Sequence, residues 1–224
     1  MNDGKVYIIV GHYGSGKTEF AVNFVYNLVN QGRKVAISDL DIVNPYFRSR
    51  EKSIEFKEVG VKLISNNFEN DSLIDIPAIS AEIQSLFINK ERDNILDVGG
   101  DAVGATVLGR YAKDISRIDY EMWMVINANR YQTQSTEQVI EFIKNIEFKS
   151  NLKINGLINN THYLRETSIE DIIKGDILVR SISKLINVSV KYVVYLKNKQ
   201  SEVEKLNLLG ELFPIDMHMR PNWL

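Results

Sequence analysis

The chain has 224 residues, of which 44% are hydrophobic and 25% charged, a composition typical of a globular protein large enough to bury a core. Lys and Arg number 27 against 29 Asp and Glu, and this net charge of −2 argues against nucleic acid and anionic membranes as partners. The chain has no Cys and only three His, namely His12, His162 and His218, which excludes disulfides, iron–sulfur ligation, thiolate zinc sites and a Cys nucleophile.

No hydrophobic segment reaches the ~20 residues of a membrane-spanning helix. The apolar stretch from Val6 to Val10 is too short for a secretory signal. Gly and Pro are few, and no repeat or low-complexity linker interrupts the chain. The sequence therefore predicts a cytoplasmic protein with a single domain over residues 1–224.

Short runs rich in Val and Ile alternate with longer segments of helical period. This pattern is typical of α/β proteins in which helices cover both faces of a mostly parallel central sheet, here of about seven strands. The tail from Leu206 to Leu224 is expected to add a final short strand and a packed terminus. The seven strands are predicted at residues 5–10, 34–38, 61–65, 94–98, 121–127, 153–159 and 189–196.

Three segments have clear helical periodicity. The first follows the first strand and ends near Gly32, a residue suited to the position just past a helix C-terminus. The second runs from about Thr136 to Phe148. The third spans Ile169 to Ile186, where the pair Gly175-Asp176 predicts a break into two helices, with Asp176 as the N-cap of the second.

The first strand is followed by a glycine-rich loop, Gly11-His12-Tyr13-Gly14-Ser15-Gly16-Lys17-Thr18. It matches G-x-x-x-x-G-K-[ST] at every fixed position and leads into an amphipathic helix. Its glycines allow consecutive N–H groups to point at phosphate oxygens, and the helix dipole favours an anion there. We expect Lys17 to reach the β- and γ-phosphates and the Thr18 hydroxyl to coordinate Mg²⁺. The alternative is an accidental glycine turn.

A phosphate loop needs a metal-anchoring carboxylate at the end of a neighbouring strand. Asp97 supplies one after the apolar run that begins at Asn94. We expect Asp97 to bind Mg²⁺ through a water, and Gly100 to let the backbone approach or leave the γ-phosphate. Alternatively, Asp97 caps a helix at an unrelated strand end. Asp101 either caps the helix that starts near Val103 or takes part in metal binding or catalysis.

A second acidic segment follows the second strand. Asp39 and Asp41 are separated by Leu40, and strand alternation places both carboxylates on the same side of the chain. An aspartate here can orient the attacking water or help to hold the magnesium shell. The alternative is an Asx-type turn that leads into Asn44-Pro45.

The glycine-rich loop, the D-x-D of residues 39–41 and the h-D-x-G-G of residues 96–100 together resemble the MinD, ParA and CobQ/CobB-like (SIMIBI) branch of P-loop NTPases, which also contains the nitrogenase iron protein. The resemblance covers most of the chain, is strong over residues 5–50 and 94–112, and is faint in the C-terminal third. It implies ATP and Mg²⁺ as cofactors, with the metal held by Thr18 and anchored by Asp97. It also implies a catalytic water oriented by Asp41, with Asp39 as the other switch carboxylate.

The chain departs from this branch in two places. Many members carry a second lysine early in the loop, which reaches across a dimer to the partner's nucleotide; here His12 occupies that position, followed by Tyr13. An imidazole can still contact phosphate, and a nucleotide-dependent homodimer stays open. The tail from Met217 to Leu224 is neither basic nor helical in period, unlike the membrane-targeting tail of MinD, which argues against a membrane partner.

Base selection is indicated by Asn159 and Asn160 at the end of the sixth predicted strand, where related NTPases often place a base-contacting asparagine. An amide can pair with either the donor or the acceptor edge of adenine. The chain lacks an N-K-x-D pattern, whose aspartate would favour guanine, so ATP is favoured over GTP. The alternative is that the two asparagines only turn the chain.

Three functions fit these motifs. In the first, an ATPase switch, ATP orders residues 39–50 and 99–110, and hydrolysis releases them for an unidentified protein partner. The second is an ATP-dependent small-molecule ligase or phosphotransferase of the CobQ/dethiobiotin-synthetase type, with Arg48, Arg50 and Arg110 as candidate substrate contacts. The third is a nucleotide sensor without hydrolysis. The absence of Cys disfavours a metallochaperone, and the net charge disfavours DNA binding.

Overall fold

The computed structural model describes residues 4–40, 52–65, 83–87, 91–100 and 102–220. Four candidate residues from the sequence, Asp41, Arg48, Arg50 and Asp101, lie outside the described residues, as does the pair Asn44-Pro45. Within these ranges, no helix combines the length and the hydropathy that crossing a membrane requires.

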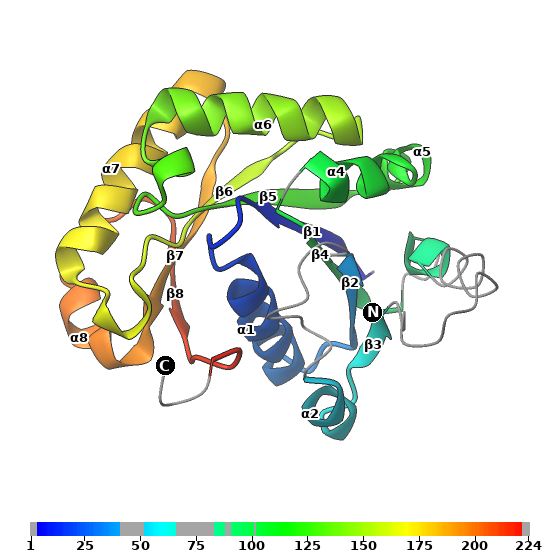
Figure 1. Cartoon of the computed structure of the whole chain (residues 1–224). Coiled ribbons are helices and arrows are strands. Elements are labelled where there is room, and N and C mark those ends of the chain that lie inside the picture. The colour runs from blue at the N-terminus through cyan, green and yellow to red at the C-terminus, as the bar shows by residue number, and fades with distance from the viewer. Residues whose placement is uncertain (1–3, 41–51, 66–82, 88–90, 101, 221–224) are drawn as a thin grey trace.

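Eight strands form one sheet in the order β3-β2-β4-β1-β5-β6-β7-β8 (Figure 1). All neighbouring strands are parallel. The predicted α/β class is confirmed. The sheet has one strand more than the seven expected, because the final short strand predicted in the tail, β8, joins it as an edge strand, where Pro214 is tolerated. The strands are Val6–Gly11 (β1), Val35–Leu40 (β2), Lys62–Ser65 (β3), Asp93–Val98 (β4), Tyr120–Ile126 (β5), Gly156–Asn159 (β6), Val190–Leu196 (β7) and Glu211–Ile215 (β8).

Strand β1 lies in the middle of the sheet, between β4 and β5. The chain builds one half of the sheet through β2, β3 and β4, and then crosses β1 to build the other half from β5 onwards. In open parallel sheets, ligands bind beyond the carboxyl ends of the strands at the point where the strand order reverses. The glycine-rich loop directly follows β1 and therefore lies at this point.

Helices cover both faces of the sheet (Figure 1). Helices α1 and α2 pack on one face, α4 to α7 pack on the other, α8 packs beside α7, and residues 83–87 are also helical. The predicted second helix, from Thr136, is confirmed. The helices are Lys17–Asn30 (α1), Ser53–Glu58 (α2), Ala102–Gly109 (α4), Ala112–Ile115 (α5), Thr136–Ser150 (α6), Ile169–Ile186 (α7) and Gln200–Val203 (α8).

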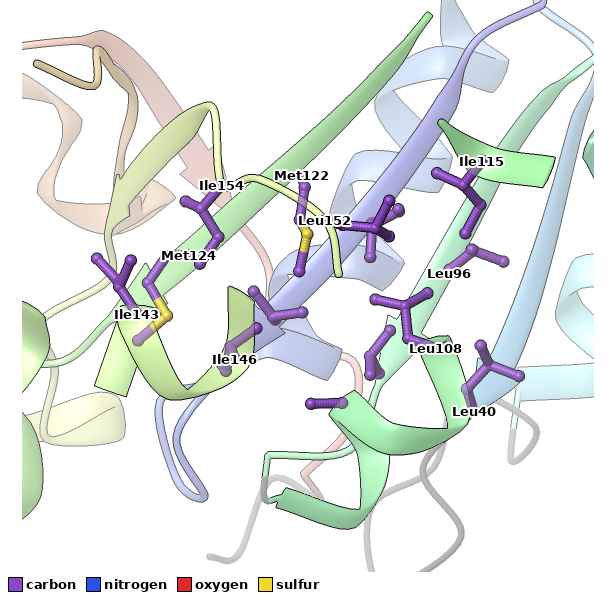
Figure 2. Packing of buried hydrophobic residues seen from close by; sticks show 14 of the residues in the cluster. Leu40, Leu96, Leu108, Ile115, Met122, Met124, Ile143, Ile146, Leu152 and Ile154 are labelled. Carbon is purple, nitrogen blue, oxygen red and sulfur yellow. The ribbon is translucent and has the colours of Figure 1, made fainter. Parts of the chain in front are cut away.

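The two layers of the core differ in chemistry. On the α1 face the core is aromatic: Phe24 contacts Tyr7 and Trp123 with ring centroids 4.9 and 5.2 Å away. Alternate residues of the same strands point to the opposite face, where the core is mostly aliphatic. Figure 2 shows this second layer, which includes Leu96, Leu108, Met122, Met124, Ile143 and Ile146.

Helix α1 ends at Asn30, and Gly32 lies just past its C-terminus, as predicted. This glycine has a φ of 76°, a conformation that L side chains rarely adopt. Its N–H donates to the carbonyl of Val29 (2.8 Å), and the N–H of Arg33 donates to that of Leu28 (3.1 Å). These bonds satisfy carbonyl groups of the last turn and stop the helix.

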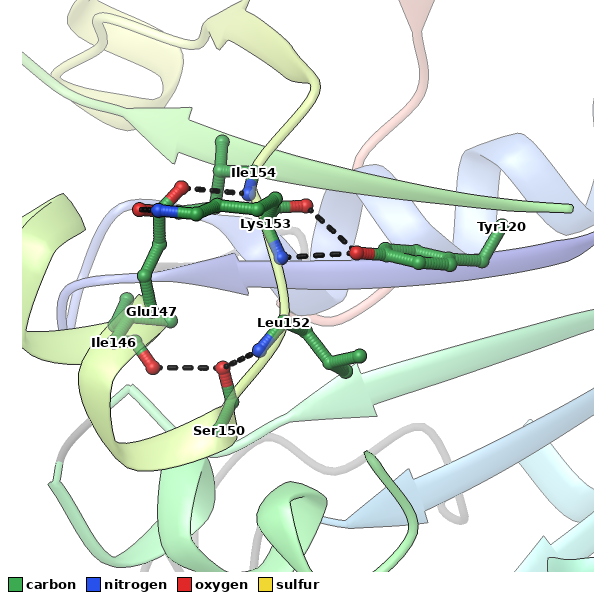
Figure 3. A network of polar contacts seen from close by, with 7 residues as sticks. All are labelled: Tyr120, Ile146, Glu147, Ser150, Leu152, Lys153 and Ile154. Atoms are coloured by element: carbon green, nitrogen blue, oxygen red, sulfur yellow. Dashed lines mark hydrogen bonds and ion pairs between the residues drawn. The ribbon is translucent and has the colours of Figure 1, made fainter. Parts of the chain in front are cut away.

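Residues 153–155 form a connector, not the start of a strand as predicted (Figure 3). Three consecutive backbone N–H groups donate to side chains, so they cannot join the hydrogen-bond ladder of the sheet. The first backbone bond to β5 comes from Asn155, whose N–H donates to the carbonyl of Met122 (3.0 Å), and the sixth strand begins at Gly156. The acceptors are Ser150 Oγ for Leu152 (3.3 Å), the Tyr120 hydroxyl for Lys153 (2.9 Å) and Glu147 Oε1 for Ile154 (3.0 Å).

The predicted break at Gly175-Asp176 is wrong, because α7 is continuous from Ile169 to Ile186. A Cβ at Gly175 would lie only 2.1 Å from Asn159 Oδ1 and 2.2 Å from Thr161 Oγ1, so the glycine allows the helix to approach the end of β6. Asp176 is buried and accepts the N–H of Leu209 (2.7 Å), so it connects α7 to the segment before β8 instead of capping a helix.

Because α7 and the end of β6 lie so close together at Gly175, we predict that Gly175→Ala destabilises the protein. In an open helix position the change would stabilise the protein by up to ~1 kcal/mol through helix propensity. Here we expect it to lower the free energy of unfolding by about 1 to 3 kcal/mol through overpacking. Urea denaturation measures the effect, with Lys184→Ala on the exposed face of α7 as the control. A stabilised Gly175→Ala variant would contradict the packing role.

Candidate functional site

The loop between β1 and α1 has the backbone of an anion-binding site. Gly14 and Gly16 have φ values of 74° and 80°. The N–H of Ser15 donates to the carbonyl of His12 (3.0 Å), which closes the turn. Gly16 occupies the N-cap position of α1, where no side chain caps the helix. The N–H groups of the first turn can therefore serve an anion.

The ends of two neighbouring strands press against this loop. A Cβ at Gly11 would lie 2.6 Å from the carbonyl oxygen of Val125 in β5. A Cβ at Gly100, just after β4, would lie 2.7 Å from the carbonyl oxygen of Gly11 and 2.8 Å from the nitrogen of Tyr13. Backbone atoms cannot move aside as a flexible side chain can, so a larger residue at Gly100 would displace the loop. The structure thus brings Gly100 to the loop, and its predicted role at the γ-phosphate stays a prediction.

Asp39 and Asp97 are paired across neighbouring strands β2 and β4. Two residues earlier in these strands, Ile37 and Ile95 belong to the core layer on the α1 face. Since side chains alternate along a strand, both carboxylates lie on this same face, the one that carries Lys17 and the start of α1. Asp97 is fully buried, and Asp39 is 7% exposed.

The oxygen groups at this corner suit a hard cation. Mg²⁺ binds carboxylate and hydroxyl oxygens and usually keeps several waters or phosphate oxygens in its shell. Asp39, Asp97 and Thr18 offer such oxygens. In the described part of the chain, no group of three or more His, Asp or Glu side chains could hold a metal by itself. The residues present therefore fit a magnesium ion that is bound together with a phosphorylated ligand.

A cavity of about 290 Å³ opens beside the loop. At one end it is lined by loop residues, including Thr18 and the buried Lys17. At the other end it is lined by apolar side chains from β7, β8 and the segment after β8. These are Val194, Leu196, Ile215, Met217 and Met219.

Two asparagines at strand ends hold the loop from the side. The Asn160 side chain donates to the carbonyl of Ser15 (2.8 Å) and lines the cavity. Asn127, after β5, is fully buried; it accepts the N–H of His162 (3.2 Å) and donates to the carbonyl of Gly14 (3.4 Å). The ends of β5 and β6 are thereby joined to the loop.

Asn159 is placed differently from Asn160. Its Nδ2 donates to the carbonyl of Ile172 in α7 (3.1 Å), and its Oδ1 accepts from the Oγ1 of Thr161 (2.9 Å). It is not among the cavity-lining residues within the described part of the chain. Its predicted contact with a base stays a prediction, and its side chain makes bonds that hold α7 to β6.

His12 also lies away from the described cavity lining, whereas Tyr13 is part of it. The Nδ1–H of His12 donates to the carbonyl of Tyr13 (2.9 Å), and its ring meets Phe142 of α6 edge-on at 5.4 Å between centroids. Tyr13 is 60% exposed. The side chain of His12 is therefore directed to α6 in this structure.

The segment after β8 is fastened to α1. Asn23 donates to the carbonyl of Asp216 (2.9 Å) and accepts its N–H (3.0 Å). The carboxylate of Glu19 accepts the N–H groups of His218 (2.6 Å) and Met219 (3.1 Å). Burial raises the pKa of Glu19 above its usual range, and these N–H donors oppose that shift. The bonds keep Met219 at the apolar end of the cavity.

If these bonds hold the segment, Asn23→Ala should loosen it without unfolding the protein. Loss of a buried hydrogen-bond partner costs ~1 to 3 kcal/mol, so we expect amide exchange at residues 216–219 to speed up by about 5- to 150-fold. Hydrogen exchange measures this, with Asn27→Ala, one turn further along α1, as the control. Unchanged exchange at residues 216–219 would contradict the role of Asn23.

His162 lies beside the loop, with Nε2 about 3.0 Å from where a Cβ on Gly16 would be. Its Nδ1 accepts the N–H of Leu164 (3.2 Å), which assigns the ring proton to Nε2. Burial, together with the nearby Arg130 and Arg220, lowers the pKa of His162 to about 4. At neutral pH the ring is therefore uncharged and offers a donor, not a charge.

This shift predicts how stability depends on pH. The unfolded chain protonates His162 near pH 6.5 and the folded protein only near pH 4, so stability is lost as pH falls between these values. In His162→Asn, whose Oδ1 can still accept from Leu164, the loss between pH 7 and pH 4.5 should be smaller by about 2 kcal/mol. Urea denaturation at both pH values measures it, and equal losses in both proteins would contradict the assignment.

Several lining residues were not predicted. Arg130 lies four residues after the end of β5, which neighbours β1. Its position in the loop after a predicted strand was the sequence signal that could have identified it. His162 follows the two asparagines at the end of β6. Met217 and Met219 carry no sequence signal, because only the bonds of the tail to α1 bring them to the cavity.

Comparison with known proteins assigns the sequence to a family of nucleotide-binding domains. Residues 7–192 match the CbiA family, described as the CobQ/CobB/MinD/ParA nucleotide binding domain. No curated protein matches the sequence.

Solved structures share the fold at low identity. The cell division protein FtsY of Thermotoga maritima superposes with a TM-score of 0.56 at 18% identity, over 85% of this chain and 63% of that one. The signal recognition particle 54 kDa protein of Aeropyrum pernix, in complex with GDP, gives 0.55 at 19% identity, over 81% and 40%. A nucleotide-binding protein of Archaeoglobus fulgidus, in complex with ADP, gives 0.51 at 12% identity, over 95% and 82%. The chain thus spans less than two thirds of the FtsY chain.

Proposed function

The chain belongs to the CobQ/CobB/MinD/ParA nucleotide-binding domain family, and we propose that it is a magnesium-dependent ATP-binding protein that hydrolyses ATP as a switch for an unidentified partner. One observation carries this proposal. A single cavity connects Lys17 and Thr18 of the glycine-rich loop to an apolar pocket, which matches the polyanionic and the flat apolar ends of a nucleotide.

The phosphates would lie along the loop, where backbone N–H groups, Lys17 and the start of α1 provide positive potential. Thr18 and Asp97 would hold Mg²⁺, with Asp39 beside Asp97 on the neighbouring strand. The metal would neutralise charge on the phosphates. Asp41 is proposed from the sequence to orient the attacking water.

The described lining of the cavity favours adenine over guanine, because its one carboxylate is already hydrogen-bonded within the protein. Guanine is usually recognised by a carboxylate that accepts its two N–H donors, as the aspartate of N-K-x-D does. Within the described lining, Glu19 is the one carboxylate, and its two oxygens already accept the N–H groups of His218 and Met219. Asn160 and the apolar side chains of β7 and β8 would then contact the base.

The solved structures with this fold include both a GDP and an ADP complex, so the fold alone does not choose the base. Direct competition between ATP and GTP for the wild-type protein tests the choice. We expect ATP to bind more tightly.

A calorimetric titration with Mg-ATP tests nucleotide binding. We expect Lys17→Ala to abolish detectable binding, because the cation is lost from the phosphate end, while Lys113→Ala on the exposed side of α5 binds as the wild type does. Retained micromolar affinity in Lys17→Ala would contradict the phosphate-loop assignment.

The same preparations separate an ATPase from a sensor. Phosphate release at saturating Mg-ATP should fall at least tenfold in Asp41→Asn while ATP affinity is kept. Binding without phosphate release by the wild type would favour a non-hydrolysing sensor. Equal rates in wild type and variant would remove Asp41 from the mechanism.

A further inference from the structure

Arg130 is held in a defined turn at the end of β5, next to the glycine-rich loop. Its N–H donates to the carbonyl of Asn127 (3.1 Å), and its carbonyl accepts the N–H of Thr133 (2.9 Å). Thr133 Oγ1 also donates to the carbonyl of Asn127 (2.7 Å). Since Asn127 is fully buried and bonded to Gly14, the turn has little freedom relative to the loop.

The guanidinium of Arg130 lies directly on the loop. Its Nε donates to the carbonyl of Gly14 (3.0 Å). A Cβ on Gly14 would lie 2.9 Å from this Nε and 3.2 Å from Nη2. Only the absence of a side chain at position 14 therefore lets the guanidinium approach so closely.

Most of the hydrogen-bonding capacity of Arg130 is not directed to protein groups. A guanidinium has five N–H donors in a planar fork, and the bond to Gly14 uses the one on Nε. Within the described ranges, Arg130 forms no ion pair with a carboxylate. Its two Nη groups can thus serve a ligand, and Arg130 lines the same cavity as Lys17 and Thr18.

We propose that Arg130 is a phosphate-binding residue, whose Nη groups hold the phosphates of the bound nucleotide while Nε keeps the guanidinium on Gly14. This inference rests on the proposed nucleotide-binding function and adds a residue to it. A planar fork suits phosphate oxygens, which Arg binds with two parallel hydrogen bonds. Arg130 comes from the same chain as Lys17, so this second cation needs no second subunit.

The test is a set of titrations of the full chain with Mg-ATP and with inorganic tripolyphosphate. Arg130→Gln keeps an N–H donor for the Gly14 carbonyl and removes the charge, and Arg130→Lys keeps the charge. Because hydrogen bonds to charged groups are stronger than neutral ones, we expect Arg130→Gln to bind both ligands roughly tenfold or more weakly than the wild type. We expect Arg130→Lys to bind more tightly than Arg130→Gln. Arg117→Ala, an exposed arginine ahead of β5, is the matched control and should bind as the wild type does.

The outcomes separate the two proposals. An affinity of Arg130→Gln for Mg-ATP within twofold of the wild-type affinity would overturn the role of Arg130 and leave the proposed function intact. A lower melting temperature without ligand, with Arg130→Lys as weak as Arg130→Gln, would show a structural role and would also overturn the proposal. No ATP binding by the wild type would overturn the proposed function itself, and Arg130 with it.

Discussion

The parallel pairing of β1 with β4 on one side and β5 on the other determines where every other group of the site lies. Register pairs join Ile9 to Asp97 and Gly11 to Val125, so the chain leaves β1 between two strand ends that are already fixed. The space between these ends is so small that Gly11 and Gly100 face backbone atoms closely. The conformation of the loop is therefore imposed from outside as well as by its own glycines.

Helix α1 contacts both the glycine-rich loop and the segment after β8. Its first turn ends the glycine-rich loop, and the side chains of Glu19 and Asn23 bind a segment that lies 193 to 199 residues further along the chain. The apolar end of the cavity is thus assembled on the same helix that begins at the loop. A ligand that spans the cavity would contact the N-terminal and C-terminal parts of the sheet together, and its binding would stabilise their arrangement.

Charges of both signs lie near the glycine-rich loop. Lys17, Arg130 and Arg220 line the cavity, while Asp39 and Asp97 lie on the ends of β2 and β4, outside its described lining. In the proposed complex the cations would face the phosphates, and the carboxylates would face a metal ion that is bound to the same phosphates. Burial keeps the nearby His162 neutral, so it adds a hydrogen-bond donor without further positive charge.

The sequence by itself determined the glycine-rich loop between β1 and α1, the α/β class and the acidic strand ends, because these depend on consecutive residues and on local periodicity. It misjudged places where distant segments meet. Gly175 signals a helix break locally, whereas in the protein it makes room for Asn159 and Thr161. Residues 153–155 have the composition of a strand, but the N–H groups of Lys153 and Ile154 donate to side chains.

Only the tertiary structure decided which polar and apolar groups line the cavity. Asn159 and Asn160 are adjacent and chemically identical, yet Asn159 donates to a carbonyl of α7 and Asn160 donates to the carbonyl of Ser15. Arg130 follows the central strand β5 and Met219 follows the edge strand β8, and they reach the cavity through hydrogen bonds to Gly14 and Glu19. Local propensity cannot encode such contacts, because each depends on the packing of strands that are far apart in the chain.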